Sequence, residues 1–86
     1  MASYKLSFKR SAEKELRRIS QPDLRRMVQK IQTLTQEPRP SGAQMLKGEA
    51  RYWKIRQGDY RVVYQVDDLS QEVAIIKIGH RREVYD

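Results

Sequence analysis

The chain has 86 residues, enough for a single domain over residues 1–86 with a small hydrophobic core. It contains no cysteine, which excludes disulfide bonds, thiolate metal ligands and a catalytic thiol. Its 18 Lys and Arg against 11 Asp and Glu give a net charge of +7, so the expected partner is a polyanion such as nucleic acid or an acidic protein.

The N-terminal segment does not resemble a targeting sequence. Residues 1–5 lack the apolar run of a signal peptide, and no stretch approaches the roughly 18 apolar residues that a membrane span needs. We therefore expect a cytoplasmic protein with no membrane partner.

The first half of the chain predicts a strand and two helices. Residues 4–9 alternate with period two, which places Tyr4, Leu6 and Phe8 on one face of a strand. Ser11 is the expected cap of a first helix. The apolar stripe of that helix is formed by Ala12, Leu16 and Ile19.

The second helix has clearer signals at both ends. Ser20 can cap it, Pro22 fits its first turn, and Asp23 is placed like the acidic member of a capping box. Pro38 should end it near Glu37, because proline cannot continue a helix. Its buried face is predicted to consist of Leu24, Met27, Val28, Ile31 and Leu34. The two helices should form a hairpin.

The second half predicts a β-meander. Pro, Ser and Gly between Arg39 and Gly48 indicate a loop. Three runs rich in Val, Ile, Tyr and Trp follow it, at residues 50–57, 60–66 and 72–79, separated by turn signals at 58–59 and 67–70. The predicted class is therefore α+β, with an N-terminal strand, a two-helix hairpin and a three-stranded antiparallel meander.

Gly58-Asp59 predicts the register of the first hairpin. Glycine at the first central position is typical of a type II′ turn, which pairs Gln57 with Tyr60 and therefore Arg56 with Arg61. Opposed residues share a face of the sheet. The apolar face then holds Trp53, Ile55, Val62 and Tyr64, and the opposite, basic face holds Lys54, Arg56 and Arg61.

The last strand extends this basic face. Alternation places Ala74, Ile76 and Ile78 inward and Ile75, Lys77 and Gly79 outward, with Arg81 on the side of Lys77. If the strand order brings this end beside the hairpin, one concavity gathers Lys54, Arg56, Arg61, Arg81 and Tyr85.

Such a cluster suits phosphodiester cleavage without a metal or cofactor. The sequence has no HExxH motif, no clustered carboxylates, no Gly-rich phosphate loop and a single histidine, so it lacks the parts for metal hydrolysis and triphosphate chemistry. RNA supplies its own nucleophile, the 2′-hydroxyl. The protein must align it with phosphorus, take its proton, stabilise the developing charge and protonate the 5′ leaving oxygen.

Each basic residue has an expected role in that reaction. Lys54, crowded by Arg56 and Arg61, is the candidate general base because like charge favours the neutral amine. The arginines would clamp the phosphate, and Arg81 and Tyr85 would share protonation of the leaving group. The alternative is a basic face that is only solvated, but two directly opposed arginines destabilise a sheet unless an anion lies between them.

The rings near this face have competing interpretations. His80 can act as an acid or base, or can be a packing residue, and its parity with Ile78 points it inward and favours packing. Trp53 is assigned to the core by the same parity. Tyr52 and Tyr85 are the better candidates for stacking on RNA bases.

Residues 47–48, 52–56, 58–64 and 78–85 together resemble the RelE and ParE toxin superfamily of bacterial toxin–antitoxin pairs. The resemblance covers nearly the whole chain. It implies a fold akin to small microbial ribonucleases and cleavage of mRNA in the A site of the 70S ribosome. It also implies silencing by a cognate antitoxin, a flexible and partly acidic chain that folds on binding.

The resemblance further implies site residues. Lys54 falls at the first strand lysine of the RelE active site, Arg56 falls where RelE carries a second lysine, and Arg61 falls at the arginine after the hairpin. Arg81 and Tyr85 fall at the arginine and tyrosine that follow the last strand. Arg56 is a departure, because it keeps the charge but cannot act as a base as a lysine can.

Other functions fit the same resemblance. ParE-type relatives share the fold but poison DNA gyrase without cleaving RNA, so the fold alone does not decide the function. A non-catalytic RNA- or protein-binding module is a third possibility. Some relatives use a histidine near the position of His80, which offers an alternative base.

A wider set of residues is expected to bind RNA or the ribosome. The helix charges among them either bind rRNA electrostatically or only solvate the outer helix faces. The set comprises Arg17, Arg18, Arg25, Arg26, Lys30, Lys47, Tyr52, Lys77, His80 and Arg82.

Overall fold

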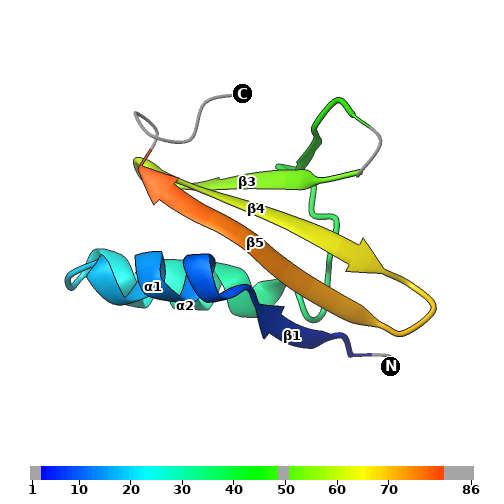
Figure 1. The fold of residues 1–86 in the computed structure, drawn as a ribbon, viewed down its shortest axis with the longest axis horizontal. Coiled ribbons are helices and arrows are strands. Elements are labelled where there is room, and N and C mark those ends of the chain that lie inside the picture. Colours follow the sequence, from blue (N-terminus) through cyan, green and yellow to red (C-terminus); the bar gives the residue numbers. More distant parts are fainter. Residues whose placement is uncertain (1–2, 49–50, 81–86) are drawn as a thin grey trace.

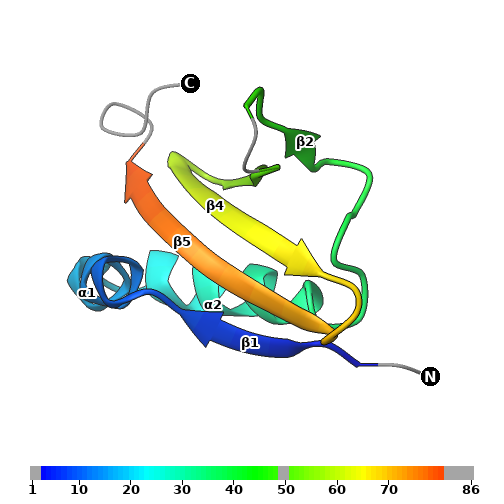
Figure 2. The same ribbon diagram turned by 45° about the vertical axis from the view of Figure 1, so that its right-hand side comes forward.

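The fold is a mixed β-sheet covered on one face by two helices (Figure 1, Figure 2). The structure, a computed structural model, describes residues 3–48 and 51–80. Its elements in chain order are β1 (Lys5–Phe8), α1 (Arg10–Arg18), α2 (Asp23–Thr33), β2 (Gln44–Met45), β3 (Trp53–Gln57), β4 (Tyr60–Asp67) and β5 (Glu72–His80). The strand order is β1-β5-β4-β3-β2, with β1 parallel to β5 and the other neighbours antiparallel.

The predicted α+β class and the β3-β4-β5 meander are confirmed, and two strands extend the sheet. β1 joins it beside β5. β2 lies inside the segment predicted as a loop, because Gln44 and Met45 pair with Lys54 and Trp53 at the edge of β3. That edge offers unpaired backbone groups, and the two residues of β2 bond part of them. β3 begins at Trp53, later than residue 50, which lies outside the described residues.

The first helix differs from its prediction at its start. α1 begins at Arg10, so Ser11 lies inside the helix and its assignment as the cap is wrong. Lys9 occupies the cap position and makes no side-chain capping bond. Ala12 and Ile19 are buried as predicted, and α1 contacts β5.

The second helix is shorter than predicted. Pro22 occupies the cap position and no side-chain capping bond forms, so the assignment of Ser20 as the cap is wrong. The helix ends at Thr33, before the predicted end near Glu37. The Thr33 hydroxyl donates to the carbonyl of Lys30 (2.6 Å), a bond three residues back that accompanies the tightening of the last turn.

The β3–β4 hairpin has the predicted register. Gln57 pairs with Tyr60 and Arg56 with Arg61, and the φ of 61° at Gly58 is the value that the first position of a type II′ turn requires. The apolar face packs on the helices. The buried cluster there includes Met27, Ile31 and Leu34 of α2 and Ile55, Val62 and Tyr64 of the hairpin.

A bulge in β5 overturns the predicted alternation of the last strand. Val63 pairs with Lys77, but the next residue, Tyr64, pairs with Ile75, so Ile76 is the extra residue. The run of apolar residues 73–76 does not reveal which of them is unpaired, because any of them could face the core.

The bulge reverses the faces on its N-terminal side. The predicted inward positions of Ala74 and Ile76 and the predicted outward position of Ile75 are therefore wrong. Ile75 is fully buried, whereas Ala74 and Ile76 are half-buried. Beyond the bulge, Lys77 and Ile78 have the predicted orientations, outward and inward.

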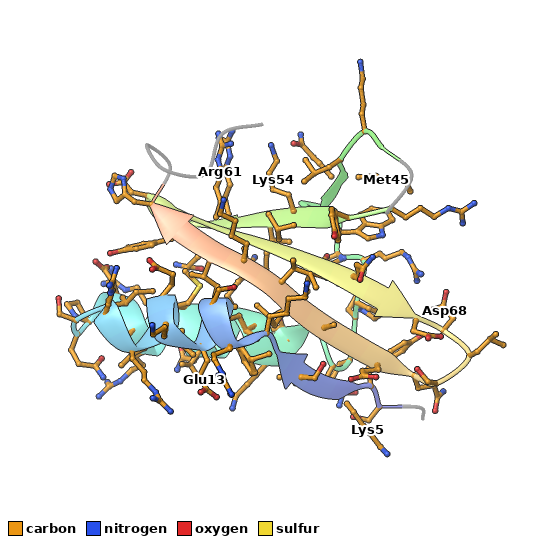
Figure 3. All side chains as sticks on the ribbon, in the orientation of Figure 1. Lys5, Glu13, Met45, Lys54, Arg61 and Asp68 are labelled. Atoms are coloured by element: carbon orange, nitrogen blue, oxygen red, sulfur yellow. The ribbon has the colours of Figure 1, made fainter. Side chains whose placement is uncertain are left out.

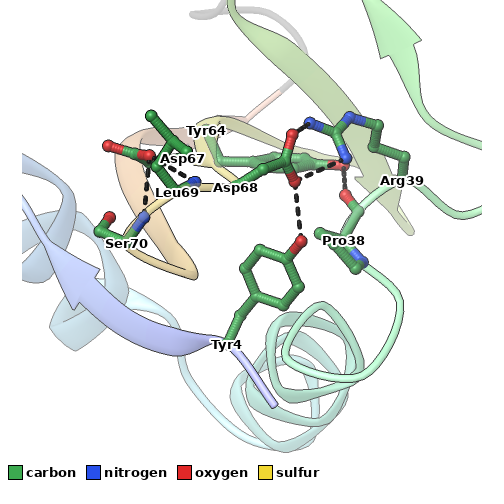
Figure 4. A network of polar contacts seen from close by, with 8 residues as sticks. All are labelled: Tyr4, Pro38, Arg39, Tyr64, Asp67, Asp68, Leu69 and Ser70. Atoms are coloured by element: carbon green, nitrogen blue, oxygen red, sulfur yellow. Dashed lines mark hydrogen bonds and ion pairs between the residues drawn. The ribbon is translucent and has the colours of Figure 1, made fainter. Parts of the chain in front are cut away.

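Polar contacts fasten the segment after α2 to one end of the sheet (Figure 4). Arg39 makes a bidentate ion pair with Asp68, with Nη2–Oδ2 at 2.7 Å and Nη1–Oδ1 at 3.2 Å, and the Tyr4 hydroxyl donates to Asp68 Oδ1 at 2.7 Å. The Tyr64 hydroxyl donates to the carbonyl of Pro38 at 2.8 Å. These bonds determine where the chain leaves the helices on its way to β2.

Two side chains of this region have shifted pKa values. The hydrogen bonds from Arg39 and then from Tyr4 lower the pKa of Asp68 below its ordinary value. Burial raises the pKa of Tyr64 to about 12. Both shifts favour the protonation states that the hydrogen bonds need, a carboxylate at Asp68 and a neutral phenol at Tyr64.

Candidate active site

Basic residues gather on the face of the sheet opposite the helices, called the outer face here. Figure 3 shows Lys54 and Arg61 projecting from the sheet on this side. The pairing places two rows of residues across it, one of Lys54, Val63 and Lys77 and one of Arg56, Arg61 and Gly79. Opposed residues share a face, so three strands contribute to a single surface.

The predicted opposition of two arginines is confirmed. Arg56 of β3 and Arg61 of β4 pair directly, next to the hairpin turn. They line a hollow of about 130 Å³ together with Gly58, Asp59 and Tyr60. On the other side of β4, Arg61 pairs with Gly79 of β5, which has no side chain to cover it. The geometry suits the bidentate grip of guanidinium groups on a phosphate.

Lys54 lies at the β3 end of its row and is nearly covered. Its exposed fraction is 6%, and it is the charged residue in the buried set of the described chain. Its neighbour in the row, Val63, is 7% exposed although it faces outward, so the floor of the surface is apolar. An amine on an apolar floor between cations is well placed to interact with a phosphodiester.

The rings of the predicted site separate into two groups. His80 packs edge-to-face against Tyr60, with ring centroids 5.5 Å apart, as the packing interpretation expected. Trp53 is half-buried against the core, and the Arg39 guanidinium carbon lies 5.7 Å from its ring centroid. Tyr52 is half-buried just before β3, close in sequence to Lys54.

The structure divides the predicted RNA-binding cations by their surroundings. Arg17, Arg18 and Arg26 lie exposed on the helices, each within 4.0 Å of a carboxylate one turn away. Arg25 is exposed on the same helical layer, and Lys47 is exposed after β2. Two others differ. Lys30 lines a cleft that also contains Lys54, and Lys77 lies on the outer face.

Several predicted residues lie outside the described part of the chain. They are Arg81, Arg82 and Tyr85. Within residues 3–48 and 51–80, no three His, Asp or Glu side chains gather in a way that could hold a metal ion. The helices of that part are too short or too polar to cross a membrane.

Three features of the site escaped the sequence. Gln44 faces Lys54 because β2 forms within a segment whose Pro and Gly content indicated only a loop. Val63 lies opposite Lys54 on the outer face, as the predicted register requires, but nothing in the sequence indicated that it would be nearly covered there. Arg39 gave no signal, since its partners come from distant turns.

Comparison with known proteins gives consistent matches. The profile of the family described as "ParE toxin of type II toxin-antitoxin system, parDE" matches residues 6–85. The toxin RelG of Mycobacterium tuberculosis is 28% identical over 83 residues, which cover 95% of each chain.

Solved structures show the same similarity. The toxin–antitoxin complex RelBE2 of M. tuberculosis matches with a TM-score of 0.81 and 28% identity, covering 94% of both chains. The intact RelBE complex of E. coli matches with a TM-score of 0.79 and 30% identity, covering 91% of this chain and 96% of the other. The archaeal RelE–RelB complex of Pyrococcus horikoshii matches with a TM-score of 0.82 and 25% identity, covering 95% and 99%.

The fold, the matched length and these relatives agree. The chain belongs to the RelE/ParE superfamily and is a toxin of a type II toxin–antitoxin system. The resemblance inferred from the hairpin and last-strand motifs is thereby confirmed.

Proposed function

We propose that the toxin is a ribosome-dependent endoribonuclease that cleaves mRNA in the A site and so inhibits translation. The observation that carries the proposal is the outer face, where Lys54 lies beside the opposed Arg56 and Arg61. The similarity to RelE toxins supports it. The reaction would take place in the cytoplasm, where ribosomes are.

The proposed reaction needs no metal. Arg56 and Arg61 hold the phosphate at the hollow by the hairpin and offset its negative charge. Lys54 acts as the general base and takes the proton of the 2′-hydroxyl. The O2′–P bond forms and the P–O5′ bond breaks, which leaves a 2′,3′-cyclic phosphate and a free 5′-hydroxyl. We assign the proton for the 5′ oxygen jointly to Arg81 and Tyr85.

The proposed partner is a cognate antitoxin protein. The similar toxins from M. tuberculosis, P. horikoshii and E. coli were solved as toxin–antitoxin complexes. A net charge of +7 favours a partner with acidic segments. Binding over the outer face would silence the toxin by covering Lys54 and the arginines.

Primer extension on programmed ribosomes tests the nuclease. Purified ribosomes carrying a defined codon in the A site are mixed with the native toxin, Lys54→Ala, or the control Lys14→Ala on the exposed surface of α1. We expect cuts confined to the A-site codon with the native toxin and the control, and a rate lower by about 10²-fold or more for Lys54→Ala. Intact mRNA with native toxin would refute the proposal.

One observation favours a second function. The matching family profile is that of ParE toxins, so inhibition of DNA gyrase is the alternative. A supercoiling assay with purified gyrase distinguishes the two. The nuclease proposal expects full supercoiling at toxin concentrations that stop translation, and the alternative expects inhibition that Lys54→Ala does not relieve.

A further inference from the structure

A cleft of about 340 Å³ lies at the edge of β3, beyond the end of β2. Lys30 reaches it from α2, Gly42 and Gln44 border it before and within β2, and Arg56 borders it from β3. Among the residues that the structure describes, none that lines the cleft is acidic. The cleft therefore presents cations from a helix and a strand to one volume of solvent.

The cations of the cleft differ in their surroundings from the four arginines that form ion pairs in the described part of the chain. Among the described residues, neither Lys30 nor Arg56 takes part in an ion pair. By contrast, Arg17 and Arg39 each face a carboxylate at 3.2 Å or less. A positive potential that no neighbouring carboxylate offsets is what an anion needs.

The backbone adds a hydrogen-bond donor to the cleft. Groups of one strand point alternately to its two neighbours, and the carbonyl of Tyr52 accepts from Leu46 on the β2 side at 2.7 Å. By alternation, the N–H of Arg56 points to the same side. β2 does not extend that far, because the N–H of Ala43 donates to Pro40 and the chain turns away.

Arg56 connects the cleft with the candidate active site. It lines both the hollow by the hairpin and this cleft, and Lys54 lines the cleft as well. A strand of RNA whose phosphate occupies the hollow can therefore place a neighbouring phosphate in the cleft. The far wall is held by Arg39 and Asp68, whose ion pair fastens the chain just before Pro40.

We infer that this cleft is a second phosphate subsite, which binds an RNA phosphodiester next to the reacting one through Lys30, Gln44 and the side chain and amide of Arg56. The inference rests on the proposed function for the identity of the RNA. Lys30 is a binding residue in this arrangement and takes no part in the chemical step.

The test measures binding without cleavage. Ribosomes are programmed with an mRNA that carries 2′-deoxynucleotides at the A-site codon, and toxin affinity is measured over a range of salt concentrations. We expect Lys30→Gln to weaken binding about tenfold and to reduce the slope of log K against log salt by about 0.7. Lys14→Gln, which removes the same charge from α1, should match the native toxin.

A pair of variants at Gly42 tests the cleft without removing a contact. A Cβ at Gly42 would meet nothing within 4 Å, and the φ there is outside the left-handed region, so substitutions should fold. Gly42→Asp introduces a carboxylate beside the phosphate and should weaken binding several-fold more than Gly42→Asn, which has the same shape. The inference would be overturned if Gly42→Asp and Gly42→Asn bound with equal affinity and Lys30→Gln also bound as tightly as Lys14→Gln.

Single methylphosphonate linkages in the mRNA identify the source of the phosphate. If one neutral linkage lowers the affinity of the native toxin but does not change the affinity of Lys30→Gln, the subsite holds an mRNA phosphate. If no neutral linkage has this effect and Lys30→Gln still binds more weakly than the native toxin, the subsite holds an rRNA phosphate. Binding without cleavage of ordinary mRNA would refute the nuclease, and the affinities would still decide the subsite.

Discussion

The buried hydroxyl of Tyr64 makes the stability of this toxin depend on pH in the alkaline range. Tyr64 is fully buried, donates to the carbonyl of Pro38 and has its pKa raised from 10.0 to about 12 by burial. Because the folded state binds this proton more tightly than the unfolded state, the contribution is complete below about pH 10. It is lost as pH rises from about 10 toward 12.

Tyr64→Phe should separate this contribution from those of other groups. We expect the native free energy of unfolding to fall by roughly 2 kcal/mol more than that of the variant between pH 10 and pH 12. Below pH 10 the variant should be less stable by about 1 kcal/mol, since the Pro38 carbonyl loses its donor. Urea unfolding at several pH values measures both, and parallel pH profiles would contradict the assignment.

At the scale of the element, the bulge in β5 decides which side chains reach the core. Ile75 and Ile76 are adjacent and chemically identical, yet Ile75 is fully buried and Ile76 is half-buried. Ile75→Ala should destabilise the protein by about 2–5 kcal/mol through a cavity. Ile76→Ala should cost clearly less, and the reverse order in denaturant unfolding would show that the bulge lies elsewhere.

The turn between β3 and β4 is a second element whose backbone can be tested. Gly58 has a φ of 61° and Gly42 does not have a left-handed φ, while a Cβ at either would meet nothing within 4 Å. Gly58→Ala should therefore destabilise by about 1–2 kcal/mol through backbone strain alone. Gly42→Ala should be neutral or slightly stabilising, and equal thermal stabilities would exclude a strained turn.

Viewed over the whole molecule, individual cations on the two sides of the sheet differ in their surroundings. Arg17 and Arg18 on the helical side face Glu13 and Glu15, whereas no described ion pair involves Lys77 on the outer face. The charge of the outer face changes sign along β4. Arg61 lies near one end of the strand and Asp67 at the other, about 20 Å apart. We therefore expect RNA to bind the half of the outer face that contains Arg61.

This arrangement predicts unequal salt effects. Lys77→Gln should reduce the salt slope of ribosome binding by about 0.7, the value for one lost phosphate contact on a single strand. Arg17→Gln should reduce it less, because Glu13 already offsets that charge. Affinity measured from low to high salt compares the two, and equal slopes for both variants would show that the helical face binds RNA as strongly as the sheet.

The local parts of this protein could be predicted from its amino-acid sequence. Gly58-Asp59 determined the hairpin register, since a two-residue loop leaves one pairing and pairing assigns Lys54, Arg56 and Arg61 to one face. Strand and helix periods determined the element order. These are consequences of neighbours in the chain, which a sequence displays directly.

Features that depend on residues distant in the chain follow from the tertiary structure instead. It inserted β2 at the edge of β3, chose Ile76 as the bulge and joined Arg39 to Asp68 across 29 residues. It also replaced the predicted serine caps with uncapped helix starts. Each outcome depends on which backbone or charged groups remain without a partner once the chain has packed. That is a property of the assembled fold.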